Sequence, residues 1–153
     1  MNNLKIETCK DGYKIFVNSC LLNDINMVFK DDLINYTKNL IYKLKTKLSL
    51  RGFYKVKVFT HTMLGLFIEI IKLDESDFSS NLDLRIVVFL EEKFYFKTDD
   101  YFLINNCKEI RYSDKMFFCL VDESFEELLE KVEFGSFIYG KDVNKLLNNS
   151  RLL

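Results

Sequence analysis

Two short runs near the start of the chain alternate between apolar and polar residues. The runs cover residues 4–9 and 13–17, and Asp11 and Gly12 stand between them. Alternation with a period of two is typical of a strand with one buried face. Asp-Gly between two such runs predicts a β-hairpin, because the central positions of a type I′ turn both need positive φ.

The next pattern has a period of 3.6 residues and predicts one long helix. Asp31 and Asp32 open the helix, it ends near Ser49, and its lysines lie in the later turns, so both ends complement the helix dipole. One broad face of this helix is the face expected to lie on a sheet. That face holds Leu33, Tyr36, Thr37, Leu40, Ile41, Leu44 and Leu48.

Alternating patterns return later and predict further strands over 54–60, 64–70, 82–90, 94–96, 109–112 and 116–121. Short helices are expected after Ser124, which forms a capping box with Glu127, and after Asp142. We therefore expect an α+β fold with an antiparallel sheet of about six to eight strands, one long helix packed on it and short C-terminal helices. A chain of 153 residues without a Pro- or Ser-rich linker predicts a single domain over residues 1–153.

The same strand pattern leaves the sheet a second face, opposite the long helix. Phe59, Phe67 and Phe89 fall on this face by alternation, among charged residues. Large apolar patches at a protein surface mark contact sites. The C-terminal helices cover this band of aromatic rings in one interpretation, and a second protomer or another protein covers it in the other.

Charge is distributed unevenly along the chain. Between Lys30 and Lys57, eight basic residues stand against Asp31 and Asp32, so this segment carries +6 and the remainder −7. A basic segment is the electrostatic footprint of nucleic-acid binding, although a net charge of −1 is not typical of such a domain. A solvated lysine face is the other interpretation, since helix C-termini favour lysine. The residues that would contact nucleic acid are Lys38, Lys43, Lys45, Lys47, Arg51, Lys55 and Lys57.

Groups suited to catalysis or metal binding are sparse. His61 is the only histidine, and neither Ser nor Cys stands at a spacing from it that indicates a nucleophile and its base. One histidine does not make the usual zinc site, and the acidic clusters lack the glycine and the ligand order of a calcium loop. The five glycines are scattered, so no phosphate-binding loop is predicted. We expect no catalytic residue, metal or cofactor, and an enzyme with an unrecognised site near His61 is an alternative.

Cysteine spacing and hydropathy indicate a cytoplasmic protein. The four cysteines match no zinc or redox motif, which favours free thiols in a reducing compartment. The first ten residues hold no apolar signal segment, and the longest apolar run, 63–68, is too short to span a membrane. Abundant Phe and Tyr without Ala or Pro are typical of a low-GC genome.

The sequence thus predicts a small cytoplasmic interaction or regulatory module of adaptor, inhibitor or immunity type, without catalytic activity. Its expected partner is another protein, or a second copy in a homodimer, because aromatic residues with a charged rim are typical of interfaces. The expected contact residues are Phe59, Phe67, Phe89 and Tyr42. Nucleic-acid binding through the basic segment is the alternative, and no membrane association is expected.

Overall fold

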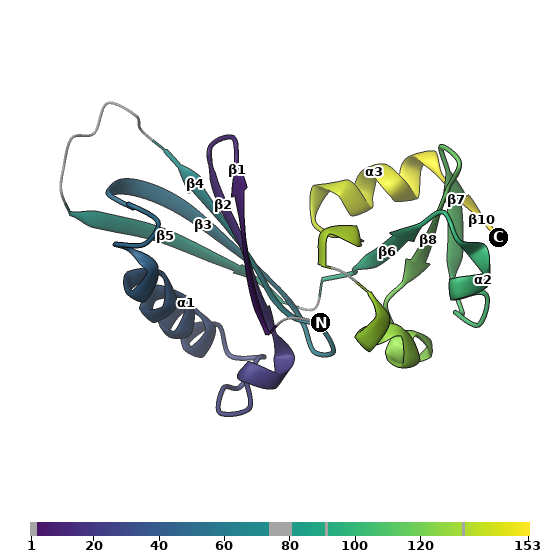
Figure 1. Cartoon of the computed structure of the whole chain (residues 1–153), viewed down its shortest axis with the longest axis horizontal. Helices are drawn as coiled ribbons and strands as arrows, with labels where there is room; N and C mark the ends of the chain where they lie inside the picture. The colour runs from purple at the N-terminus through teal and green to yellow at the C-terminus, as the bar shows by residue number, and fades with distance from the viewer. Residues whose placement is uncertain (1–2, 74–80, 91, 133) are drawn as a thin grey trace. The chain divides into compact units, whose positions relative to one another are not determined.

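The structure, a computed structural model, describes residues 3–73, 81–90, 92–132 and 134–153. The chain divides into two compact units, Asn2–Glu91 and Glu92–Leu153, and each has its own sheet (Figure 1). The expected α+β class is confirmed. The expected single sheet of about six to eight strands is wrong, because the strands of the described residues form two five-stranded sheets. A single domain over residues 1–153 stays a prediction.

The sheet of the first unit has the strand order β1-β2-β4-β3-β5. Neighbouring strands in this sheet are antiparallel, except β3 and β5, which are parallel. The expectation of a wholly antiparallel sheet is therefore wrong for the β3–β5 pair. Strands β3 and β4 are consecutive antiparallel neighbours, so β4 ends beside the start of β3. The chain then crosses to the other side of β3, where β5 starts opposite the start of β3 and runs in the same direction. The strands are β1 (Leu4–Cys9), β2 (Gly12–Asn18), β3 (Gly52–His61), β4 (Gly65–Lys72) and β5 (Leu82–Phe89).

Helix α1 (Lys30–Leu44) follows a short 3-10 helix, η1 (Ser19–Leu21), and lies along one face of this sheet (Figure 1). Leu33 and Ile41 are completely buried in the core that the helix and the sheet share. The helix is shorter than expected, because turns replace its last predicted residues and Ser49 has a positive φ of 53°. The core on the sheet side comprises Ile15, Val17, Tyr54, Val56, Val58, Leu66, Ile68, Ile70, Leu82 and Val88.

The β1–β2 hairpin forms as predicted, but its glycine has a different role. The loop is Lys10-Asp11, and Gly12 is already paired with Cys9. Gly12 does not have the positive φ that a type I′ turn would need. A Cβ at this position would lie 1.8 Å from the carbonyl oxygen of Ile70, so glycine is required for the close approach of β2 and β4.

The second unit holds a fully antiparallel sheet of order β10-β7-β8-β6-β9. Helix α3 packs on one face, where Val143 and Leu146 contact Tyr95 and Phe118. Its elements are β6 (Tyr95–Thr98), α2 (Tyr101–Ile104), β7 (Ile110–Ser113), β8 (Met116–Leu120), the 3-10 helices η2 (Glu123–Lys131) and η3 (Phe134–Ser136), β9 (Phe137–Ile138), α3 (Lys141–Asn149) and β10 (Arg151–Leu152).

The C-terminal helices begin differently from the prediction. Asp122, not Ser124, caps η2, since the Asp122 carboxylate accepts the Ser124 N–H at 2.9 Å. Asp142 lies in the first turn of α3, and Gly140, with a φ of 62°, precedes that helix. No helix within the described ranges has the length and apolar character needed to cross a membrane.

Candidate interaction site

Four phenylalanines line up across the first sheet on the face opposite α1. The register places Phe16, Phe67, Phe59 and Phe89 side by side on β2, β4, β3 and β5. The rings of Phe16 and Phe67 meet edge to face at 4.5 Å, and those of Phe59 and Phe89 stack at 4.9 Å. We call this set the phenylalanine row. The shared face of Phe59, Phe67 and Phe89 is confirmed, and sequence reasoning missed Phe16, which alternation along β2 would have placed there.

Burial divides the phenylalanine row. Phe16, Phe59 and Phe67 are 4–6% exposed, whereas Phe89 is half-buried. Rings so deeply buried have little area left to offer a partner. Partner binding by the phenylalanine row stays a prediction.

Tyr42 lies on the other side of the sheet, on α1. It is 41% exposed, and its hydroxyl donates a hydrogen bond of 3.0 Å to the carbonyl oxygen of Leu82. The four expected contact residues therefore do not form one surface. Tyr42 instead attaches α1 to the first residue of β5.

A row of alternating charge runs beside the phenylalanine row. Glu7, Lys14, Glu69 and Lys57 are neighbours on β1, β2, β4 and β3. Opposite charges directly across a strand pair are favourable, so this row is electrostatically balanced.

The following row is not balanced. Lys55 on β3 lies directly opposite Arg85 on β5, and like charges at opposed positions are destabilising. Among the residues that the structure describes, neither side chain forms an ion pair. Arg85 is exposed and Lys55 half-buried, so the β3–β5 end of this face presents positive charge that no described carboxylate contacts.

Strand β5 forms an edge of the first sheet, and the hydrogen-bond pattern shows which of its groups face outward. The Gly52 N–H donates to the Asn81 carbonyl oxygen at 2.9 Å. In a parallel pair, every second residue directs both its N–H and its C=O toward the same neighbour. Asp83, Arg85 and Val87 therefore pair with β3, while the backbone groups of Leu84 and Ile86 point away from the sheet. No other described strand lies on that side, which we call the open edge.

The open edge is long and has neither a bulge nor a proline to oppose pairing, although Asp83 and Arg85 place charges on one of its faces. Natural edge strands are short, bulged, or interrupted by Pro or charges on their faces. Strand β5 is eight residues long and pairs with β3 in one continuous register, and the chain has no proline. At the opposite edge, β1 is shorter and carries an ion pair of 3.2 Å between Lys5 and Glu7. Strand β5 is thus the edge better suited to accept another strand.

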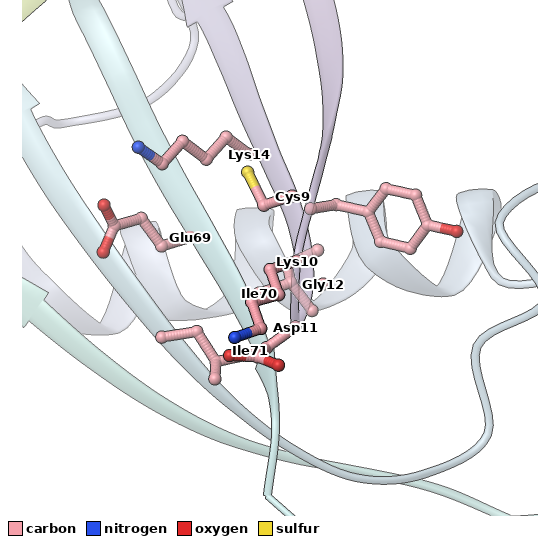
Figure 2. A pocket seen from close by; sticks show the side chains of 9 residues that line it. Cys9, Lys10, Asp11, Gly12, Lys14, Glu69, Ile70 and Ile71 are labelled. Atoms are coloured by element: carbon pink, nitrogen blue, oxygen red, sulfur yellow. The ribbon is translucent and has the colours of Figure 1, made fainter.

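A shallow hollow of about 220 Å³ lies at the hairpin end of β1 and β2, next to β4. Its lining comes from the β1–β2 hairpin and from Glu69, Ile70 and Ile71 of β4. Figure 2 shows Lys14 and Glu69 extending on the same side of the sheet, with the Cys9 sulfur beside the Lys14 side chain. No group of three or more metal-ligating side chains occurs in the described part of the chain. A single thiol with one lysine and one carboxylate does not define a reaction.

The sheet separates the residues expected to contact nucleic acid. Lys38, Lys43, Lys45 and Lys47 belong to α1 and the turns after it, and Arg51 precedes β3. Lys55 and Lys57 lie on the face opposite α1, because their neighbours Tyr54, Val56 and Val58 fill the core with the helix. The seven residues do not form one surface. Lys55 and Lys57 instead share a face with Arg85, which sequence reasoning left out of the set.

His61 ends β3 and is half-buried. Its Nδ1 accepts a hydrogen bond of 3.1 Å from the backbone N–H of Met63, which assigns the ring proton to Nε2 in the neutral form. This bond is local to the β3–β4 turn and gives His61 a structural role. An enzyme site near His61 stays a prediction.

The second unit contains two buried polar contacts. The Tyr95 hydroxyl donates a hydrogen bond to the Glu109 carboxylate, which also lies 3.4 Å from Arg111. Burial, and then the hydrogen bond and negative charge of Glu109, raise the pKa of Tyr95 to about 12. Cys107 and Cys119 are buried, the Cys119 thiol donates a hydrogen bond of 3.5 Å to the carbonyl oxygen of Leu120, and burial raises the pKa of both thiols. Such thiols are poor nucleophiles, so neither contact indicates catalysis.

Comparisons with known proteins add no family to this description: no protein-family model matches the chain, and no curated protein or solved structure was found to be similar to it.

Proposed function

We propose that the protein is a non-catalytic interaction module that binds another polypeptide along the open edge. The observation that carries this proposal is the combination of an eight-residue edge strand in unbroken register with outward backbone groups at Leu84 and Ile86. A strand that adds to such an edge gains main-chain hydrogen bonds along its length, and its side chains meet alternate pockets and charges. The regulatory role that we assign is of adaptor, inhibitor or immunity type.

The side chains around the open edge supply specificity. Asp83, Arg85 and Val87 are exposed on one face of β5, with Lys55 beside them on β3. Val87 is 36% exposed, which gives the edge an apolar contact next to the charged position of Arg85. A partner strand is thus selected by charge and by one apolar position, in addition to its backbone.

A cytoplasmic location is part of the proposal. The four cysteines are unpaired in the structure, and two of them, Cys107 and Cys119, adjoin each other as thiols. Neighbouring thiols that stay reduced fit a reducing compartment.

Proline substitution at the open edge tests the proposal. Leu84→Pro removes an N–H that points away from β3, so it leaves the hydrogen bonds between β3 and β5 in place. The same change deprives an added strand of a donor and obstructs its approach. Leu84→Ala is the matched control, because it also truncates the side chain but keeps the N–H. Both variants are compared with the wild type for folding by circular dichroism, and then used to capture proteins from the lysate of the source organism.

We expect a stoichiometric protein that the wild type and Leu84→Ala retain and that folded Leu84→Pro loses. Capture of the same protein by all three chains would contradict the assignment of the edge, as would a wild type that retains none. If Leu84→Pro does not fold, Arg85→Asp replaces it, since this exposed residue is on the same edge strand.

Nucleic-acid binding is the second candidate, and one observation favours it. Lys55, Lys57 and Arg85 lie on a single sheet face without an ion pair in the part of the chain that the structure describes. Neutralised phosphates release counterions, so affinity would fall steeply with salt. A mobility-shift titration with single-stranded and duplex nucleic acid at two salt concentrations tests it. Binding that Lys55→Glu abolishes supports this candidate, and the absence of a shift at low salt removes it.

A further inference from the structure

We propose that the open edge pairs with the open edge of a second copy of this chain, in an antiparallel dimer whose two-fold axis passes through Leu84. This inference rests on the proposed function, since it names the partner of the same edge. The observation that supports the dimer is the charge of β5, because Asp83 of each copy lies opposite Arg85 of the other copy in that register.

The outward backbone groups define which registers are allowed. Leu84 directs both N–H and C=O away from β3, and so does Ile86 two residues later. In an antiparallel pair, two opposed residues of this kind exchange both hydrogen bonds. A two-fold axis at Leu84 pairs Leu84 with its own copy and Leu82 with the Ile86 of the other copy. The Leu84 pair therefore meets the backbone requirements of an antiparallel ladder, whereas in the Leu82–Ile86 pairs the carbonyl oxygen of Leu82 would accept a second hydrogen bond beside that of the Tyr42 hydroxyl.

The side chains between these pairs are complementary in charge. With the axis at Leu84, Asp83 of each copy lies directly opposite Arg85 of the other copy. These are non-hydrogen-bonded positions, where side chains approach most closely and opposite charges attract. Both residues are exposed on the same sheet face in the structure, so they are free to meet across the edge.

The pairing also balances the row that the single chain leaves positive. Arg85 lies opposite Lys55, and neither has a described carboxylate partner. The Asp83 carboxylate of the second copy would arrive on the other side of Arg85, so the row would read Lys55, Arg85 and then Asp83 of the second copy. The Asp83 carboxylate of the second copy thus supplies a negative charge next to Arg85. A symmetric dimer contains this Asp83–Arg85 contact twice.

Neighbouring registers lack this complementarity. An axis at Arg85 places the two copies of Arg85 opposite each other, which is repulsive. An axis at Ile86 places Arg85 opposite Val87 and Asp83 opposite Phe89, so both charges lose an ionic partner. Charge therefore favours the Leu84 register over those with the axis at Arg85 or at Ile86.

A charge-reversal cycle on the full chain tests the register. The dimer dissociation constant is measured by sedimentation over a concentration series for the wild type, Asp83→Arg, Arg85→Asp and the double variant that carries both changes. Each single change turns two attractive contacts into two repulsive ones, so we expect the constant to rise roughly tenfold or more. The double variant restores opposite charges, so its constant should return close to that of the wild type. Glu7→Arg, a charge reversal on the opposite edge strand, is the matched control and should leave dimerisation unchanged.

Three results would overturn the dimer: a wild type that is monomeric at every concentration, a double variant no better than the single variants, or a loss of equal size in Glu7→Arg. Circular dichroism of each variant establishes that it is folded, and either single reversal suffices if the other does not fold. A monomeric wild type that still captures a lysate protein, lost in Leu84→Pro, leaves the proposed function intact and makes the occupant a different protein. Failure of both experiments rejects the open edge as a binding site.

Discussion

The Tyr42 hydroxyl donates a hydrogen bond of 3.0 Å to the carbonyl oxygen of Leu82, and so joins α1 to the first residue of the edge strand β5. Leu82 is one of the residues of β5 whose backbone points away from β3. The bond therefore orders the start of the open edge, where no neighbouring strand in the described chain holds it. An edge strand that is already ordered loses less entropy when a second strand pairs with it.

Removal of that hydroxyl tests the role of the bond. Tyr42→Phe should lower the free energy of unfolding by about 0.5–1.5 kcal/mol, the net value of one hydrogen bond. Tyr36→Phe is the matched control on the same helix, because the Tyr36 hydroxyl forms no hydrogen bond with any residue that the structure describes. It should be neutral within about 0.5 kcal/mol. Urea unfolding measures both. Equal effects of the two substitutions would contradict a role for the bond.

Gly12→Ala tests the close approach of β2 and β4. The added Cβ would lie 1.8 Å from the Ile70 carbonyl oxygen, so the strands must separate, and we expect a loss of about 2–4 kcal/mol in the free energy of unfolding. Lys14→Ala, an exposed position two residues along β2, should cost no more than about 0.5 kcal/mol. Chemical denaturation distinguishes the two. A Gly12→Ala chain as stable as the wild type would show that the strands are not held so closely.

Tyr95 should make stability depend on alkaline pH. Its pKa is about 12 in the folded chain against 10.0 for an ordinary tyrosine, so the folded state retains the proton that the unfolded state loses. The contribution is complete below pH 10.0 and is lost as the pH rises toward about 12. Denaturant unfolding across this interval should show a steeper fall of stability for the wild type than for Tyr95→Phe. Parallel curves for the two chains would contradict the raised pKa.

The cysteines should differ in their reaction with an alkylating reagent. Cys20 is exposed and Cys9 half-buried, whereas Cys107 and Cys119 are buried with a raised pKa. Because the thiolate is the reactive form, the native chain should be alkylated at Cys20 and Cys9 well before the other two. Peptide mass spectrometry of the native and the denatured chain measures the order. Labelling of Cys119 as fast as Cys20 in the native chain would contradict it.

Local patterns were sufficient to predict most elements of the first unit. Alternation placed Phe59, Phe67 and Phe89 together on the face opposite the helix, and the register agrees. Alternation depends only on the period of a strand, so it is preserved whatever the strand pairs with. The α1 pattern likewise identified its buried face, although it did not reveal that the helix stops at Leu44.

The pairing of strands could not be predicted in the same way. The parallel pair of β3 with β5, the second sheet and the position of β5 at an edge all depend on contacts between distant segments. Lys55 lies opposite Arg85 only because β3 pairs with β5. The predicted nucleic-acid contacts were chosen by nearness in the sequence, and so that set did not include Arg85. The hydrogen bond between Tyr42 and Leu82 could not be predicted for the same reason, since the two residues are 40 positions apart in the sequence.

Amide hydrogen exchange along β5, measured residue by residue at increasing protein concentration, tests the open edge most directly. The N–H groups of Asp83 and Arg85 face β3 and should be protected at every concentration, because their bonds lie within one chain. Those of Leu84 and Ile86 should exchange rapidly in dilute protein and become protected as the concentration rises. Rapid exchange of Leu84 and Ile86 at all concentrations would contradict pairing of the edge with a second copy, and protection of both in dilute protein would show that the edge is not open.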